Sequence, residues 1–198
     1  MSKNAVCLLV ALLFLLPGSS ARAEERYTFD KKHTSILFSV GSLGVSRVKG
    51  QFSNYDGDFV FCIQHPDKDE VAITIYPASL RTSEGEMDND LRGPDFFNAA
   101  QFPRMRFVST TVKLIDKDNA KITGNLTLLG ITRQVTVEAH FTEKEHDTES
   151  GDYVVSFSAS GIIKRSDFGM NHLIPVIGDE VRLDIQVKGV EEKSGIKD

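Results

Sequence analysis

The chain has 198 residues, a length that suits one domain with one hydrophobic core, and its 28 Asp and Glu outnumber its 23 Lys and Arg. This acidic balance argues against a nucleic-acid-binding protein, because a phosphate backbone is bound by clustered Lys and Arg. Of the two cysteines, Cys7 lies in a leader that we expect to be removed, so Cys62 would remain alone and no internal disulfide is expected.

The N-terminal segment has the pattern of a cleavable secretory signal. Lys3 precedes twelve apolar residues, 5–16, and the small residues Ala21 and Ala23 mark a cleavage site. Twelve residues are too few to span a bilayer as a helix, which takes about 20. We therefore predict that residues 1–23 are removed, that residues 24–198 form a single domain, and that the mature protein is exported and is not an integral membrane protein.

The remainder of the chain alternates apolar and polar residues with the period of two that is typical of β-strands. In 181–188, for example, Val, Leu, Ile and Val alternate with Arg, Asp, Gln and Lys. Gly, Asp and Asn in 116–119 and 149–152 indicate hairpin turns. We predict an all-β, eight-stranded antiparallel barrel with short connections. Its strands are expected at roughly 34–41, 45–61, 70–79, 104–115, 121–128, 134–141, 152–164 and 181–188.

Cys62 lies in the apolar segment 59–63, which has the sequence Phe-Val-Phe-Cys-Ile. The segment predicts a strand in which the thiol is buried and inert. The alternative is a redox or catalytic thiol.

One segment, 83–98, lacks the strand alternation. Met87 and Leu91 lie four residues apart, on one helical face, and two phenylalanines follow at 96 and 97. We predict one or two short helices packed across the barrel opening as a lid. The alternative is a surface excursion that covers a sheet edge.

Sequence signatures of catalysis and of metal binding are absent from the chain. It contains no Gly-x-Ser-x-Gly elbow that would nominate a nucleophile, and neither His-Glu-x-x-His nor Cys-x-x-Cys. We therefore predict no catalytic residue, no metal site and no enzymatic activity.

Two motifs point to a known family. Residues 124–132 read Gly-Asn-Leu-Thr-Leu-Leu-Gly-Ile-Thr, and residues 165–170 read Arg-Ser-Asp-Phe-Gly-Met. In this order they resemble the signature of the YceI family. The similarity extends to 33–40, 48–52, 79–82, 95–97 and 179–183, and so covers nearly the whole mature chain.

The resemblance implies a lipocalin-like periplasmic barrel, with a helix at its opening, that holds a polyisoprenoid chain along its axis. Prenyl phosphates and quinone-type lipids are the ligands it implies; no other cofactor is expected. Where many members have a His after the first strand, this chain has 40–43, and where they have an Arg-Asp-x-His-Leu stretch it has 87–91. Both departures remove polar or basic groups near the expected mouth, which favours a neutral head group.

The predicted site combines an apolar cavity with a lid. The expected cavity and lid residues are large and apolar: Phe38, Phe52, Met87, Leu91, Phe96, Phe97, Met105, Phe107, Phe168 and Met170. The candidates for a head-group donor are arginines, because a guanidinium suits phosphate or carbonyl oxygens: Arg165, Arg47, Arg92 and Arg104. For Arg165, the alternative is an ion pair that fixes the loop 166–178.

Three functions remain open at this stage. The first is a carrier or store for a long-chain isoprenoid. The second is a quinone-binding barrel with a redox or enzyme-accessory role, and the third is a ligand-free, stress-related scaffold with a filled core. The oligomeric state is open, and a dimer is one of the alternatives.

Overall fold

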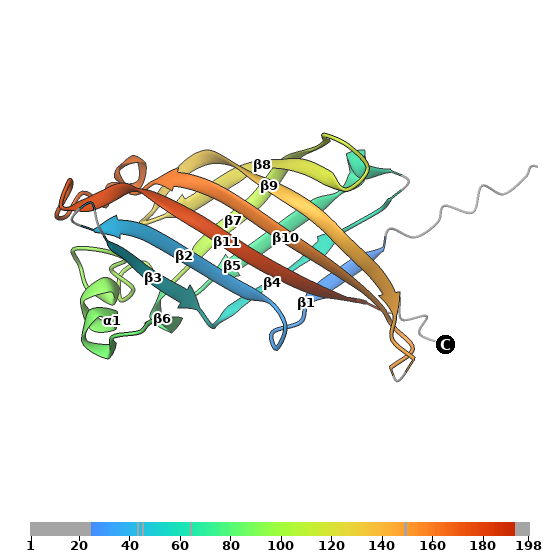
Figure 1. Ribbon diagram of the computed structural model, residues 1–198, viewed down its shortest axis with the longest axis horizontal. Coiled ribbons are helices and arrows are strands. Elements are labelled where there is room, and N and C mark those ends of the chain that lie inside the picture. Colours follow the sequence, from blue (N-terminus) through green and yellow to red (C-terminus); the bar gives the residue numbers. More distant parts are fainter. Residues whose placement is uncertain (1–24, 43, 45, 64, 149, 193–198) are drawn as a thin grey trace, which may run out of the picture.

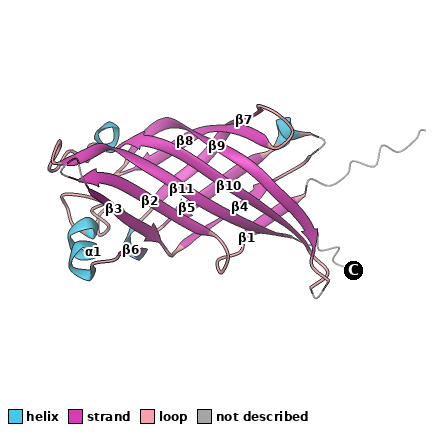
Figure 2. Ribbon diagram, in the orientation of Figure 1, coloured by secondary structure: helices cyan, strands magenta, loops and turns pink. Residues whose placement is uncertain are grey.

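The computed structural model describes residues 25–192 except 43, 45, 64 and 149 (Figure 1). The predicted signal segment, 1–23, lies outside the described residues. Strands and turns dominate the described part (Figure 2). The strands are β1 (Arg26–Phe29), β2 (Ser35–Ser42), β3 (Ser46–Phe52), β4 (Tyr55–Val60), β5 (Glu70–Ile75), β6 (Leu80–Thr82), β7 (Met105–Leu114), β8 (Asn119–Leu128), β9 (Ile131–His146), β10 (Tyr153–Lys164) and β11 (Ile177–Glu191). The helices are α1 (Gly85–Arg92) and the 3-10 turns η1 (Pro66–Lys68), η2 (Pro77–Ser79) and η3 (Arg165–Phe168).

The strands close into a barrel because β11 pairs with both β1 and β2. β1 and β2 run in succession along β11, so together they form one interrupted strand. β3 and β4 form another, pairing with β2 and β1, and β5 and β6 form a third, pairing with β4 and β3. The strands β7 to β11 follow as a meander. The predicted eight-stranded antiparallel barrel is confirmed.

The break between β3 and β4 was not expected, since 45–61 reads as one strand. Ser79, at the end of η2, explains it: its Oγ accepts a hydrogen bond from the backbone N–H of Asn54 at 2.9 Å, and its carbonyl accepts one from the N–H of Ser53 at 3.4 Å. η2 itself begins at Pro77, which has no N–H to continue the ladder of β5. The two neighbouring strands therefore bend together.

The two ends of the barrel are built differently (Figure 1). One end carries the β2–β3 hairpin, α1 with the segment 93–104, and the segment 165–176; we call it the helix end. The opposite end carries the segment 61–69, with η1, and the hairpin turns after β7 and β9; we call it the far end.

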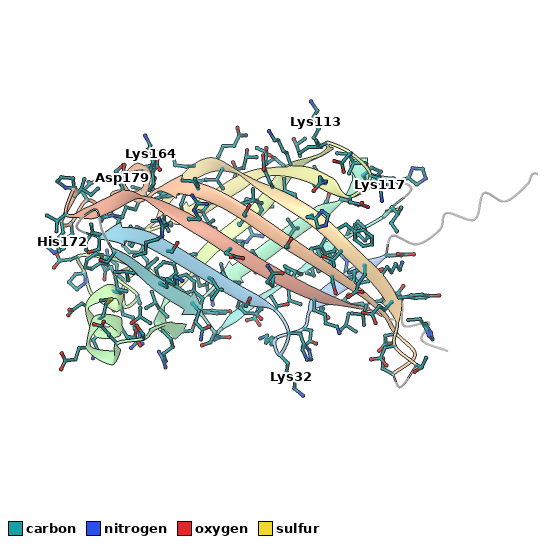
Figure 3. All side chains as sticks on the ribbon, viewed as in Figure 1. Lys32, Lys113, Lys117, Lys164, His172 and Asp179 are labelled. Atoms are coloured by element: carbon teal, nitrogen blue, oxygen red, sulfur yellow. The ribbon has the colours of Figure 1, made fainter. Side chains whose placement is uncertain are left out.

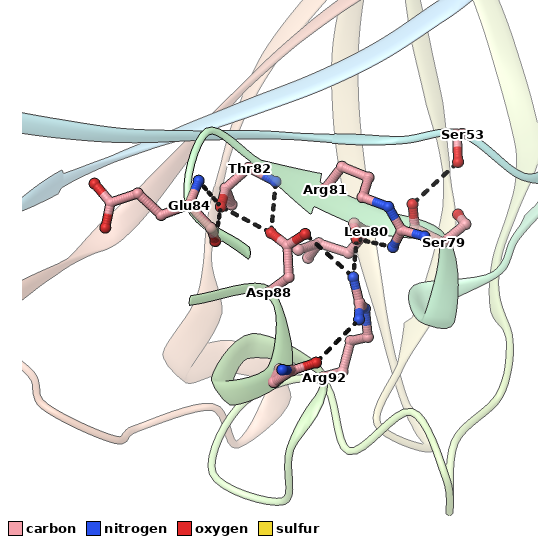
Figure 4. A network of polar contacts seen from close by, with 9 residues as sticks. Ser53, Ser79, Leu80, Arg81, Thr82, Glu84, Asp88 and Arg92 are labelled. Carbon is pink, nitrogen blue, oxygen red and sulfur yellow. Dashed lines mark hydrogen bonds and ion pairs between the residues drawn. The ribbon is translucent and has the colours of Figure 1, made fainter. Parts of the chain in front are cut away.

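A network of polar contacts fixes α1 to β6 (Figure 4). Asp88 is buried on α1, and its Oδ1 accepts hydrogen bonds from the Thr82 N–H at 2.6 Å and from the Thr82 hydroxyl at 2.8 Å. Arg92, one turn later, donates to Asp88 at 3.2 Å and to the Leu80 carbonyl at 2.7 Å. Hydrogen bonds from the Thr82 side chain and backbone, together with the charge of Arg92, lower the pKa of Asp88. The helix predicted within 83–98 is therefore present and anchored at one end of the barrel.

Candidate functional site

The barrel encloses an elongated cavity of about 490 Å³. Its walls come from the inward face of every strand except β6, and they are predominantly apolar, as the period-two alternation requires. A volume of this size lies within the range of about 300–1,000 Å³ in which proteins hold small ligands. The middle of the wall is formed by Ile73, Phe107, Ile122, Ala139, Ala159 and Ile185.

At the helix end, three aromatic rings form the end wall of the cavity. Phe38 of β2 and Phe52 of β3 lie 5.4 Å apart between ring centroids. Phe97, from the segment after α1, packs edge-on against both, at 6.2 and 5.5 Å. The backbone N–H of Phe97 donates to the Leu91 carbonyl at 2.9 Å, which ties this ring to α1. The helical insertion thus contributes one side chain directly to the cavity wall.

A second aromatic group lines the cavity toward the far end. Phe157 of β10 lies 4.9 Å from Phe61, 5.5 Å from Phe141 and 5.9 Å from Phe59 between ring centroids. Strand alternation places these residues on the inner face, but the prediction of site residues omitted them. The alternation of the predicted strands at 45–61, 134–141 and 152–164 could have identified them, because each of these phenylalanines occupies an apolar position of that alternation.

Glycines on the inner face allow aromatic rings to lie flat against the sheet. A Cβ built on Gly124, in the first family motif, would come within 2.5 Å of Phe107 Cζ. A Cβ on Gly50 would come within 2.4 Å of Phe38 Cζ. Because these rings occupy the space of the missing side chains, they project less into the cavity.

The structure places the ten predicted apolar residues in two groups. Six line the cavity: Phe38, Phe52, Phe97, Met105, Phe107 and Met170. The other four lie outside its lining. Leu91 and Phe96 pack against the core from the helix end, Phe168 is buried within that core, and Met87 is half-buried on α1. Their roles in ligand binding stay predictions.

Arg165 is 3% exposed, and its guanidinium is surrounded by backbone carbonyls. It donates to the carbonyls of Met170, His172, Ile177 and Gly178 at 2.8–3.0 Å. Burial lowers its pKa, although the nearby charge of Asp179 opposes this effect. The guanidinium therefore holds the segment 170–178 against η3 at the helix end. It does so through hydrogen bonds to backbone carbonyls, whereas the alternative raised in the sequence analysis was an ion pair.

The other three arginine candidates also lie at the helix end. Arg92 donates to Leu80 and Asp88, as described above. Arg47, which is exposed on β3, donates to the Ser39 hydroxyl at 2.9 Å. Arg104 is exposed just before β7. Arg165 is the one member of the four that reaches the cavity lining.

Cys62 lies beyond the end of β4, so its predicted position within a strand is wrong. Its backbone N–H donates to the Asp69 carboxylate at 2.8 Å, which turns the chain out of the ladder. The side chain is half-buried and lines the cavity at the far end.

Within residues 25–192, as far as these are described, no group of three or more His, Cys, Asp or Glu is arranged to hold a metal ion. In the same part of the chain, no helix has the length and apolar character needed to cross a membrane.

Solved structures share this architecture. BcnA of Burkholderia cenocepacia superposes with a TM-score of 0.74 at 20% identity, over 81% of this chain and 98% of its own. A YceI protein of Campylobacter jejuni superposes with a TM-score of 0.70 at 30% identity, over 77% and 90%. A polyisoprenoid-binding domain from Saccharophagus degradans gives a TM-score of 0.66 at 13% identity, over 84% and 98%.

Sequence comparison identifies the family. Protein YceI of Salmonella arizonae is 37% identical over 193 residues, which cover 98% of this chain and all of the relative. Protein YceI of Salmonella enteritidis matches to the same extent. The family model of the YceI-like domain matches residues 27–189, from β1 to β11. The chain therefore belongs to the YceI-like family.

Proposed function

We propose that this protein binds a long-chain isoprenoid or a similar amphiphile inside its barrel and serves as a carrier or store, without catalysis. The observation that carries the proposal is the apolar cavity that runs along the barrel between the two aromatic groups. A cavity of this shape favours an elongated hydrocarbon over a compact polar metabolite.

The energetics support useful affinity. Each methylene buried in an apolar wall contributes about 0.8 kcal/mol, so ten buried carbons contribute roughly 8 kcal/mol before the costs of association and ordering. A solidly filled scaffold is less well supported, because the inner face leaves this space open.

The relatives support the same ligand class. The Saccharophagus degradans domain is described as polyisoprenoid-binding. Its sequence is only 13% identical to this chain, so the comparison supports a shared fold. In this chain, that fold encloses the site proposed here. We further propose that the protein acts in the periplasm. This rests on the secretory pattern of residues 1–23.

The proposal is tested by introducing a charge into the cavity wall at the helix end. Phe97→Asp places a carboxylate against Phe38 and Phe52, where it would lie beside the bound chain. The matched control is Leu173→Asp, at the same end but 49% exposed and outside the lining. We expect Phe97→Asp to lower lipid per folded protein at least several-fold and Leu173→Asp to leave it unchanged, as measured by mass spectrometry of extracts. Full lipid occupancy in both variants would refute the proposal.

A further inference from the structure

The cavity reaches the surface at the far end. Its lining there includes Ile63, which is 63% exposed, and Lys117, whose side chain is 89% exposed. These residues belong to the segment after β4 and to the turn between β7 and β8, which lie side by side at the far end (Figure 1). We call the gap between them the mouth.

At the helix end, the corresponding lining side chains are closed in. Phe38, Phe52, Met105, Leu128 and Met170 are each less than 10% exposed, and Phe97 packs against the first two. Arg165, the cation that lines this end, donates hydrogen bonds to four backbone carbonyls. This end therefore suits the terminus of a hydrocarbon chain, and the exposed mouth suits a polar head.

The charged groups that line the mouth are mainly acidic. They are Asp69, Glu70 and Asp118 against Lys117, and Lys117 is itself paired with Asp118 at 2.8 Å. Two nearby lysines lie outside the lining: Lys113 is exposed on β7 and points away from the barrel (Figure 3), and Lys68 is exposed on η1. An anionic head group at the mouth would thus meet a net negative lining, whereas an uncharged one would not.

We propose that the ligand lies with its hydrocarbon terminus at Phe97 and its head group at the mouth, and that the mouth selects an uncharged head group over a phosphate. This rests on the proposed lipid-binding function and adds the direction of entry and the class of head group.

The expected selectivity follows from simple electrostatics. One unit charge acting on another about 10 Å away in water changes an equilibrium constant by roughly twofold. A diphosphate with two or more charges, facing a lining with two net negative charges, is therefore disfavoured about tenfold or more at low ionic strength. The effect should shrink as salt is added, because the screening length falls below that distance.

The first experiment compares two lipids that differ only in the head. The full protein, stripped of lipid, is titrated with geranylgeraniol and with geranylgeranyl diphosphate, and bound lipid is measured by mass spectrometry. We expect the alcohol to bind about tenfold more tightly at low salt. Glu70→Lys should tighten diphosphate binding by about tenfold relative to alcohol binding. The control Glu86→Lys, which reverses an exposed charge on α1 at the helix end, should change neither.

The second experiment uses Cys62 as a probe of the mouth. A loaded ligand should slow its modification by N-ethylmaleimide several-fold, and prior attachment of a bulky maleimide should reduce later loading by at least half. The control protein, Cys62→Ser with Ser83→Cys, carries its thiol on an exposed residue at the helix end, where modification should not affect loading.

Three results would overturn the inference while leaving the proposed function intact: diphosphate binding as tight as alcohol binding, loading blocked from residue 83 and not from residue 62, or no modification of Cys62 in the stripped protein. If neither lipid binds, the proposed function fails, and the inference fails with it.

Discussion

The role of Arg165 can be tested by removing its guanidinium while keeping a side chain of similar length. Arg165→Met leaves four carbonyls, those of Met170, His172, Ile177 and Gly178, without their donor. A buried acceptor left unsatisfied costs about 1–3 kcal/mol, and a partly exposed one costs less because water can replace the donor. With one of the four bonds buried and three partly buried, we expect a loss of about 3–5 kcal/mol in the free energy of unfolding.

The assay is equilibrium urea unfolding of the lipid-free protein, followed by far-ultraviolet circular dichroism, together with lipid per folded molecule at low denaturant. A loss of this size is a large share of the stability of about 5–15 kcal/mol that is usual for a domain. Arg165→Lys should fall between the wild type and Arg165→Met, because an ammonium can reach some of the carbonyls but has no planar fork. A destabilisation below about 1 kcal/mol together with lost lipid would refute the structural role and favour a head-group donor.

Two further predictions concern the cavity wall and the anchor of α1. Gly124→Ala should cost about 1–3 kcal/mol, because the new Cβ would lie 2.5 Å from both the Phe107 ring and the Val108 carbonyl oxygen. The backbone of β7 must then shift and the ring is pushed into the cavity, which lowers lipid uptake. Gly41→Ala, with nothing within 4 Å, is the control, and equal behaviour of the two in urea unfolding and loading would contradict the account. Because the folded-state pKa of Asp88 is lowered, its carboxylate stabilises the fold above the unfolded pKa of about 3.9, and this contribution is lost as the pH falls through the folded pKa. Wild type and Asp88→Asn should therefore differ in stability at neutral pH and converge as the pH falls from about 4 through the folded pKa, and a difference that is constant with pH would contradict the assignment.

The barrel was predictable from the sequence because strand alternation is a local property. In 181–188, each apolar residue faces inward simply because its neighbours face outward. The strand breaks were not predictable in the same way. The break at Ser53 and Asn54 depends on Ser79, 25 residues further along the chain, and alternation contains no sign of that contact.

The site was predicted in part for a related reason. The family resemblance identified Phe38, Phe52 and Phe107 as cavity residues, and all three line the cavity. It placed the opening at the helical segment, near 40–43 and 87–91, whereas the exposed lining residues Ile63 and Lys117 lie at the far end. The arginine candidates were chosen for their chemistry, whereas the role of Arg165 depends on four carbonyls, three of them contributed by residues 172–178. Such a cluster forms only when the segment folds back on η3.

The central claim, a lipid inside the barrel, is tested most directly by native mass spectrometry of the protein isolated from the exported fraction without added lipid. We expect a species heavier than the polypeptide by the mass of one isoprenoid-type amphiphile, lost on denaturation and recovered in an organic extract. A single species at the mass of the polypeptide alone, together with no uptake of geranylgeraniol by that protein, would contradict the claim.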